Sequence, residues 1–141
     1  MTVKQISVFL ENHPGKLAEF TRLLSESKIN LRAITVAEAS DFGIIRIIVD
    51  DVVNATTVIR DADYICSVTD VLAVEIKDEP GALANMITVL GENDVNVEYM
   101  YALSNSKKNA VYMMIRVADD VKAAQVLEKS GIRTVGQDAL T

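Results

Sequence analysis

The sequence predicts an α+β fold made of two similar units of about 70 residues each. The first observation is a repeat: residues 12–18 (Asn-His-Pro-Gly-Lys-Leu-Ala) recur as residues 78–84 (Asp-Glu-Pro-Gly-Ala-Leu-Ala), so the two prolines are 80 − 14 = 66 positions apart. At this register seven pairs between positions 12 and 30 are identical: Pro14/Pro80, Gly15/Gly81, Leu17/Leu83, Ala18/Ala84, Leu24/Leu90, Glu26/Glu92 and Asn30/Asn96. The second observation is that strand-like and helix-like apolar spacings follow in the same order in both copies. Such self-similarity indicates a duplicated structural unit.

The first strand and helix are predicted by a change in apolar spacing. Residues 3–10 contain alternating apolar positions and several β-branched side chains, which is typical of a strand. A breaker cluster follows at residues 12–15, where Pro14 suits the first turn of a helix because its missing N–H is no loss there. Apolar residues then keep helical spacing to about residue 27: Leu17, Phe20, Leu23 and Leu24.

The remaining elements of the first copy form a hairpin, a helix and a strand. Residues 31–39 and 44–49 predict the hairpin, with its turn at residues 40–43. Asp50 or Asp51 is expected to cap the second helix, and the chain is apolar and extended again from residue 64. In the second copy we expect strands at residues 71–76, 95–103, 110–117 and 132–135, a hairpin turn at 104–109, and helices from residue 81 and from Asp119 or Asp120. The register there lengthens from 66 to 68, which places two extra residues near the second hairpin or the following helix cap.

The order strand, helix, strand, strand, helix, strand predicts a ferredoxin-like βαββαβ unit. Such a unit has a four-stranded antiparallel sheet with two helices on one face. The sequence therefore predicts two tandem ferredoxin-like units, at residues 1–70 and 71–141. Residues 65–76 contain no proline or glycine, so the last strand of the first unit is expected to run directly into the first strand of the second.

Composition and charge exclude several classes of function. The chain is 50% hydrophobic and 24% charged, which indicates a globular protein. Its formal net charge of −6 argues against a nucleic-acid partner or an anionic membrane surface, since both need a basic patch. The single cysteine, Cys66, cannot form an internal disulfide, and no stretch approaches membrane length. With one histidine and no phosphate loop, zinc spacing or nucleophile motif, we expect a cytoplasmic protein with no metal and no cofactor.

The repeated segment resembles the ACT domain. The features that carry the resemblance are a strand, the pattern Asn/Asp-x-Pro-Gly-x-Leu-Ala, and a helix that ends near an apolar-Asn pair (Ile29-Asn30 and Val95-Asn96). ACT domains are ferredoxin-like regulatory modules that commonly bind amino acids and control metabolic enzymes. The resemblance covers nearly the whole chain, which is therefore similar to a stand-alone tandem ACT protein with no enzyme domain attached.

The resemblance also implies where a ligand binds. In the family the effector often lies between two ACT units, where it contacts the loop before the first helix of one unit and the start of the second strand of a neighbouring unit. In the first copy these positions are Asn12, His13, Gly15, Asn30 and Leu31. In the second copy they are Asp78, Glu79, Gly81, Asn96 and Val97.

The chemistry of these loops suits an amino acid, which presents one ammonium and one carboxylate. The start of a helix offers unpaired backbone N–H groups and the positive end of the helix dipole to the carboxylate. Asp78 offers a charge-assisted hydrogen bond to the ammonium. The alternative is that Asn12 and Asp78 are ordinary helix caps. The loops also differ in charge, because Asn12-His13 of the first copy corresponds to Asp78-Glu79 of the second. The two sites are therefore expected to differ in affinity, and one of them can be purely structural.

We consider three hypotheses about the function. The first is a non-catalytic regulatory homodimer that binds a free amino acid and modulates a metabolic enzyme. The second is a regulatory or scaffold subunit that binds a partner enzyme without a small-molecule ligand. The third, a small enzyme, needs a cluster of titratable groups in a pocket, and no such cluster is evident in the sequence. Cys66 is interpreted as an inert residue of an apolar strand, and the acidic pairs Asp50-Asp51 and Asp119-Asp120 as helix caps.

Overall fold

The computed structural model describes residues 1–39, 41–105 and 108–140. The chain divides into two compact units, Lys4–Thr69 and Asp70–Thr141, the latter together with Met1–Val3. They are called the N-terminal unit and the C-terminal unit below. Residue 40 and residues 106–107, which fall in the two expected hairpin turns, lie outside the described residues. The division into domains 1–70 and 71–141 stays a prediction about which segments fold as separate units.

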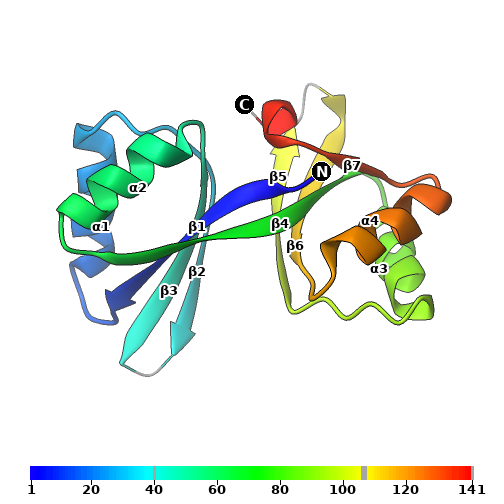
Figure 1. Ribbon diagram of the computed structural model, residues 1–141, viewed down its shortest axis with the longest axis horizontal. Coiled ribbons are helices and arrows are strands. Elements are labelled where there is room, and N and C mark those ends of the chain that lie inside the picture. The colour runs from blue at the N-terminus through cyan, green and yellow to red at the C-terminus, as the bar shows by residue number, and fades with distance from the viewer. Residues whose placement is uncertain (40, 106–107, 141) are drawn as a thin grey trace. The chain divides into compact units, whose positions relative to one another are not determined.

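The N-terminal unit has the predicted βαββαβ order (Figure 1). Its elements are β1 (Val3–Glu11), α1 (Lys16–Glu26), β2 (Leu31–Ala39), β3 (Phe42–Val49), α2 (Val52–Asp61) and the first part of β4 (Ile65–Lys77). β3 pairs antiparallel with both β1 and β2, and β1 neighbours β4. The strand order is therefore β2-β3-β1-β4, as expected for a ferredoxin-like unit.

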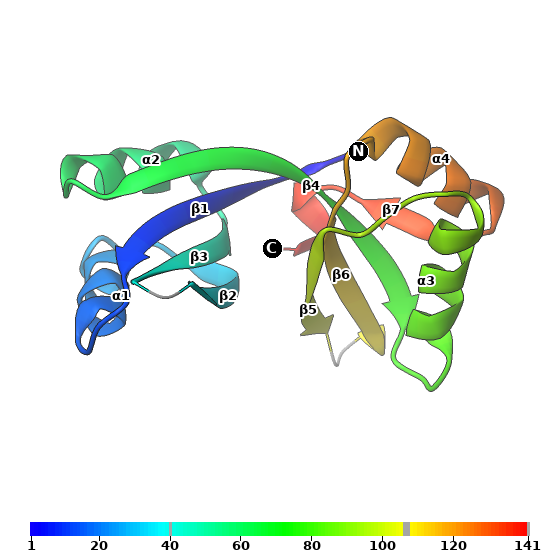
Figure 2. The same cartoon turned by 90° about the horizontal axis from the view of Figure 1, so that it is seen from below.

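The C-terminal unit repeats this topology (Figure 2). It contains the second part of β4, α3 (Ala82–Glu92), β5 (Tyr99–Asn105), β6 (Ala110–Arg116), α4 (Asp120–Lys129), β7 (Arg133–Val135) and a 3₁₀ turn (Gln137–Leu140). β4 pairs antiparallel with β6 on one side and with β7 on the other, and β5 pairs with β6. The order β5-β6-β4-β7 matches that of the N-terminal unit element by element.

In each unit both helices cover the same face of the sheet. In the N-terminal unit, Phe20 of α1 and Ile59 of α2 belong to one buried cluster with Ile6 and Ile47, which lie opposite each other on β1 and β3. Directly opposite residues in an antiparallel pair point to the same face, so the two helices share that face. The buried cluster of the C-terminal unit likewise combines residues of two strands and both helices: Leu72, Val74, Met86, Leu90, Met113, Ile115, Val117, Ala123 and Leu127.

Several local predictions are confirmed. β4 is a single strand of 13 residues whose two parts belong to the two units. Two residues separate β2 from β3, whereas four separate β5 from β6, so the two extra residues of the second copy lie in its hairpin turn. Asp51 caps α2 by accepting a hydrogen bond from the Asn54 N–H at 3.0 Å. Asp119 caps α4 in the same way.

The expected start of the first helix is wrong by two residues. Pro14 was assigned to the first turn, but α1 begins at Lys16 and α3 begins at Ala82. The reason is that Gly15 and Gly81 occupy the N-cap positions in a left-handed conformation, with φ of 91° in both. Glycine adopts this conformation without the steric cost of a Cβ atom, so the Pro-Gly pair forms the turn into the helix rather than its first turn.

A candidate ligand site in the C-terminal unit

The two Pro-Gly loops have the same backbone hydrogen bonds. Asn12 N–H donates to the Asp41 carbonyl at 3.0 Å, and Asp78 N–H donates to the Asn109 carbonyl at 3.1 Å. These bonds tie the start of each loop to the hairpin turn between the second and third strands of its unit. The loops are therefore held in place at one end by the sheet and at the other by the helix.

The alternative that Asn12 and Asp78 are ordinary helix caps is not supported. Gly15 and Gly81, three residues later, hold the N-cap positions of α1 and α3. A Cβ atom built on either glycine would meet no heavy atom within 4 Å, so the space above each backbone is open. The helix start, with its backbone N–H groups and positive dipole end, is thus accessible to an anionic group at this point.

The structure does not bring the predicted site residues together within one unit. Glu79 and Gly81 lie before α3, whereas Asn96 and Val97 come after it and line a separate pocket of about 460 Å³. A helix of 11 residues is about 16 Å long, so the two groups lie at opposite ends of it. The N-terminal unit has the same arrangement, with Asn30 and Leu31 in a pocket of about 510 Å³ beyond the end of α1: Thr21, Leu24, Ser25, Lys28, Ile29, Asn30 and Leu31.

The largest of the described pockets lies beside the second Pro-Gly loop. It has a volume of about 710 Å³ and is bounded by the end of β4, the loop, the start of α3, the β5–β6 turn and the segment that joins α4 to β7. Glu79 and Gly81 line it, so two of the predicted residues face this space. The pocket also has five charged lining residues of both signs: Glu75, Lys77, Glu79, Lys108 and Arg133.

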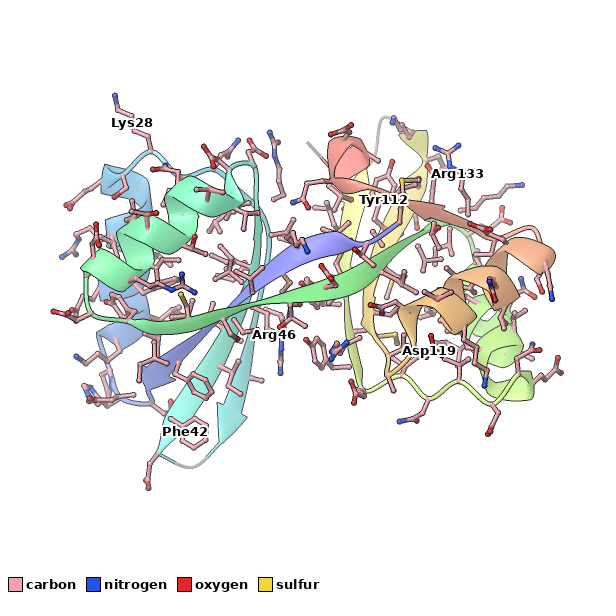
Figure 3. All side chains as sticks on the ribbon, in the orientation of Figure 1. Lys28, Phe42, Arg46, Tyr112, Asp119 and Arg133 are labelled. Atoms are coloured by element: carbon pink, nitrogen blue, oxygen red, sulfur yellow. The ribbon has the colours of Figure 1, made fainter. Side chains whose placement is uncertain are left out.

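Two charged lining residues, Glu75 and Arg133, pair across neighbouring strands, and Tyr112 contacts Glu75 from a third strand without lining the pocket. Glu75 of β4 lies opposite Tyr112 of β6 and opposite Arg133 of β7. Arg133 Nε is 3.3 Å from Glu75 Oε2, and the Tyr112 hydroxyl donates a long hydrogen bond of 3.4 Å to Glu75 Oε1. The Glu75 side chain is 24% exposed, whereas that of Arg133 is 73% exposed. Tyr112 and Arg133 lie at the same end of the sheet in Figure 3.

The equivalent pocket of the N-terminal unit is smaller and aromatic. It has a volume of about 360 Å³, and each of its lining residues has a counterpart in the lining of the larger pocket: Phe9, Leu10, Glu11, Lys16, Glu19, Phe42, Ala62, Asp63, Tyr64 and Ile65. The larger pocket is lined in addition by Glu79, Pro80, Gly81, Lys108 and Asn109. Phe9 replaces Glu75 at register 66, and Ile65 replaces Arg133 at register 68. The rings of Phe9 and Phe42 lie with their centroids 6.0 Å apart, and Figure 3 shows Phe42 where β3 begins. The two copies thus keep the pocket's position but not its chemistry.

Two predicted ligand residues of the N-terminal unit are engaged with protein groups. His13 Nε2 lies 2.8 Å from a carboxylate oxygen of Glu11, and this hydrogen bond, with the charge of Lys16, holds the pKa of Glu11 below its ordinary value. The Asn30 amide donates to Asp50 at 3.2 Å. Asp50 also accepts a bidentate pair from Arg32 at 2.6 and 2.9 Å, and this pair is the main cause of the lowered pKa of Asp50.

Sequence reasoning missed the charged residues outside the loop. Glu75 and Arg133 are 58 residues apart and meet only because β4 pairs with β7. A usable signal was nevertheless present. When the repeats are superposed at registers 66 and 68, Phe9 aligns with Glu75 and Ile65 with Arg133, an exchange of apolar for charged side chains at two positions.

The family of the chain follows from comparison with known proteins. The profile of the ACT domain pair family matches residues 1–141. The chain belongs to this family. It is similar to the protein BT0572 from Bacteroides thetaiotaomicron, whose crystal structure is 36% identical in sequence with a TM-score of 0.91 over 99% of this chain and 96% of that chain. No match was found among curated proteins.

Two more distant structures share the fold of this ACT domain pair. One is the regulatory subunit of aspartate kinase from Thermus thermophilus in its ligand-free form, at 14% identity and a TM-score of 0.63 over 90% of this chain and 91% of that chain. The other is aspartate kinase from Synechocystis, at 17% identity and a TM-score of 0.57 over 92% of this chain and 26% of that chain. At these identities the likeness establishes the shared architecture.

Two further properties bear on the function of this ACT domain pair. Among the helices in the described part of the chain, none has the length and apolar character needed to cross a membrane. The described residues also include no group of three or more His, Cys, Asp or Glu side chains arranged to hold a metal ion.

Proposed function

We propose that this ACT domain pair is a non-catalytic regulatory protein that binds a free amino acid and modulates a metabolic partner. The observation that carries the proposal is the pocket of about 710 Å³ beside the second Pro-Gly loop, which combines an accessible helix start with charged groups of both signs. A free amino acid is a zwitterion, and a binding site for it must satisfy both of its charges.

The loop provides a partner for each charge of an amino acid. Backbone N–H groups at the start of α3 and the positive end of its dipole suit the carboxylate, and Gly81 allows close approach to the backbone. Glu79 faces the pocket, and Asp78 is exposed on the same loop, so either carboxylate suits the ammonium. In the N-terminal unit the smaller pocket is lined by three aromatic residues, Phe9, Phe42 and Tyr64, together with four charged ones, and no residue of the first Pro-Gly loop is among its lining residues. The proposal therefore places the ligand at the second loop.

Regulation is proposed to come from a site completed by a neighbouring unit. Asn96 and Val97 lie at the far end of α3 from the loop, so they contribute to the same site only if they come from another unit. A homodimer provides such a neighbour. Binding between two units shifts an association or conformational equilibrium toward the state with the higher affinity, and this shift is what a metabolic partner would sense.

The test is thermal unfolding of the full chain against a panel of the common amino acids. A ligand at about 100 times its Kd adds roughly 2.7 kcal/mol to the free energy of unfolding, which raises Tm by several degrees. Asp78→Ala should weaken the effect of the ligand far more than it changes Tm without ligand. Asn12→Ala, at the equivalent position of the first loop, is the matched control and should leave the ligand effect unchanged. If no amino acid shifts Tm at high millimolar concentration, the proposed function is wrong.

A second candidate is a scaffold subunit that binds a partner enzyme without a small-molecule ligand. It is favoured by exposed apolar side chains on the N-terminal unit, where Phe9, Phe42 and Ile65 are 45%, 44% and 72% exposed. This candidate predicts co-purification with a catalytic subunit that is lost in Phe9→Ser and kept in Asp78→Ala. The amino-acid hypothesis predicts instead that the ligand-induced rise in Tm is lost in Asp78→Ala and kept in Phe9→Ser.

A further inference from the structure

We propose that the pocket of the C-terminal unit selects amino acids that carry a carboxylate in their side chain. This inference rests on the proposed function, because it assumes that the pocket binds a free amino acid, and it adds the class of ligand. It depends on the signs of the charged residues around the pocket and on which of them already have partners.

The lining of the pocket contains more cations than anions. Lys77, Lys108 and Arg133 are cationic, whereas Glu75 and Glu79 are anionic. Arg133 Nε lies 3.3 Å from Glu75, so these two charges largely compensate each other. Among the lining residues, two lysines and one glutamate are left to interact with a ligand, and they lie on different segments: the end of β4, the loop before α3 and the β5–β6 turn. Asp78 is exposed on the same loop but is not among the lining residues.

An amino acid with an acidic side chain matches this set of charges. Its ammonium pairs with Glu79, and its two carboxylates find the helix start and two lysines. An amide side chain of the same shape leaves one lysine without an anionic partner. A basic side chain brings a further positive charge toward Lys77 and Lys108, which is unfavourable at short range.

The repeat shows that this charge pattern is specific to the second pocket. In the N-terminal unit the position of Lys77 is taken by Glu11, with opposite charge, and that of Arg133 by Ile65. Lys108 belongs to the β5–β6 turn, which is two residues longer than the β2–β3 turn. The cationic lining is therefore present in one copy only, in a chain whose formal net charge is −6.

The experiment is calorimetric titration of the full chain with isosteric pairs at low ionic strength. L-Glutamate is compared with L-glutamine, and L-aspartate with L-asparagine, so each pair differs in charge and hardly in shape. We expect the Kd of the better acid to be about tenfold lower than that of its amide, the size of one charge-assisted hydrogen bond. Glutarate, which lacks the ammonium, should bind more weakly than glutamate. Added salt should reduce the preference, since these charges are partly exposed.

Variants connect the preference to the pocket. Lys77→Gln and Lys108→Gln should each bring the ratio of acid to amide affinity toward one. Both lysines are exposed, so folding is expected to be unaffected, and circular dichroism checks this. Lys122→Gln, on an exposed position of α4 outside the pocket, should leave the ratio unchanged.

The outcomes separate the two proposals. If amino acids bind but amides bind as tightly as acids, or if Lys122→Gln changes the ratio as much as the pocket variants do, the acidic preference is wrong and the proposed function stands. If no amino acid binds, both are wrong. If glutarate binds as tightly as glutamate, the pocket recognises dicarboxylates rather than amino acids, which also overturns the inference.

Discussion

Addition of one methyl group at Gly81 tests the geometry on which the candidate site depends. Gly81 has φ of 91° and ψ of −19°, a left-handed conformation that an L-residue with a Cβ atom adopts at a cost of about 1–2 kcal/mol. The added Cβ would meet no heavy atom within 4 Å, so neither a clash nor new packing alters this value. Gly81→Ala should therefore lower the free energy of unfolding by about 1–2 kcal/mol through backbone strain alone.

The control makes the same chemical change in the same unit at Gly91. This glycine lies inside α3 with an ordinary helical backbone, and its added Cβ also meets nothing within 4 Å. Gly91→Ala should raise the free energy of unfolding by roughly 0.5 kcal/mol, because alanine loses less backbone entropy in a helix. The two variants thus have opposite expected signs for an identical gain of one methyl group.

The assay is urea unfolding followed by circular dichroism, with midpoints compared at equal m-values. Gly15→Ala should behave like Gly81→Ala, because the two glycines have the same φ and ψ. The reasoning is refuted if Gly81→Ala is neutral or stabilising, or if it moves the midpoint in the same direction as Gly91→Ala.

Two further predictions concern acidic residues away from the pocket. Removal of either helix cap, by Asp51→Ala or Asp119→Ala, should lower the free energy of unfolding by about 1 kcal/mol. Serine at the same position also caps a helix and should keep most of this stability. Equal losses for alanine and serine in urea unfolding would contradict the capping role. Arg32 lowers the pKa of Asp50 in the folded protein, so the pair stabilises the fold above the ordinary pKa of aspartate and this contribution is lost as pH falls through the folded value. The difference in Tm between wild type and Asp50→Asn should therefore be present at pH 7 and shrink below about pH 4, and a difference that is constant with pH would count against it.

Much of the fold follows from local patterns in the sequence. The 66-residue repeat and the apolar spacing predict two βαββαβ units because each element is determined largely by its own periodicity and flanking breakers. The caps were predicted to within one residue, at Asp50 or Asp51 and at Asp119 or Asp120, because a cap depends on a hydrogen bond only three residues along the chain; the structure has Asp51 and Asp119. The helix start was misplaced at Pro14 because proline permits a first turn, whereas Gly15 requires a left-handed conformation that ends the turn one residue later.

The candidate site was only partly predictable. The sequence points to both Pro-Gly loops without choosing between them, and Glu79 and Gly81 of the second loop do face a pocket. The other residues of the site, Glu75, Lys108 and Arg133, come from a strand, a turn and another strand that are distant in the chain. Their meeting depends on strand pairing, and pairing partners are not determined by any short segment.

The sequence by itself determined that this protein is a duplicated scaffold, because periodicity and capping residues act over a few neighbouring positions and the same local patterns recur 66 residues later. The tertiary structure decided which side chains surround the equivalent pocket of each copy. Phe9 and Phe42 line a small pocket in one unit, whereas Glu75 and Arg133 take the places of Phe9 and Ile65 in a wider pocket in the other. The physical reason is that a pocket's charge and volume are set by side chains that β-sheet pairing brings together from distant positions, so a duplicated fold keeps its architecture while these side chains change.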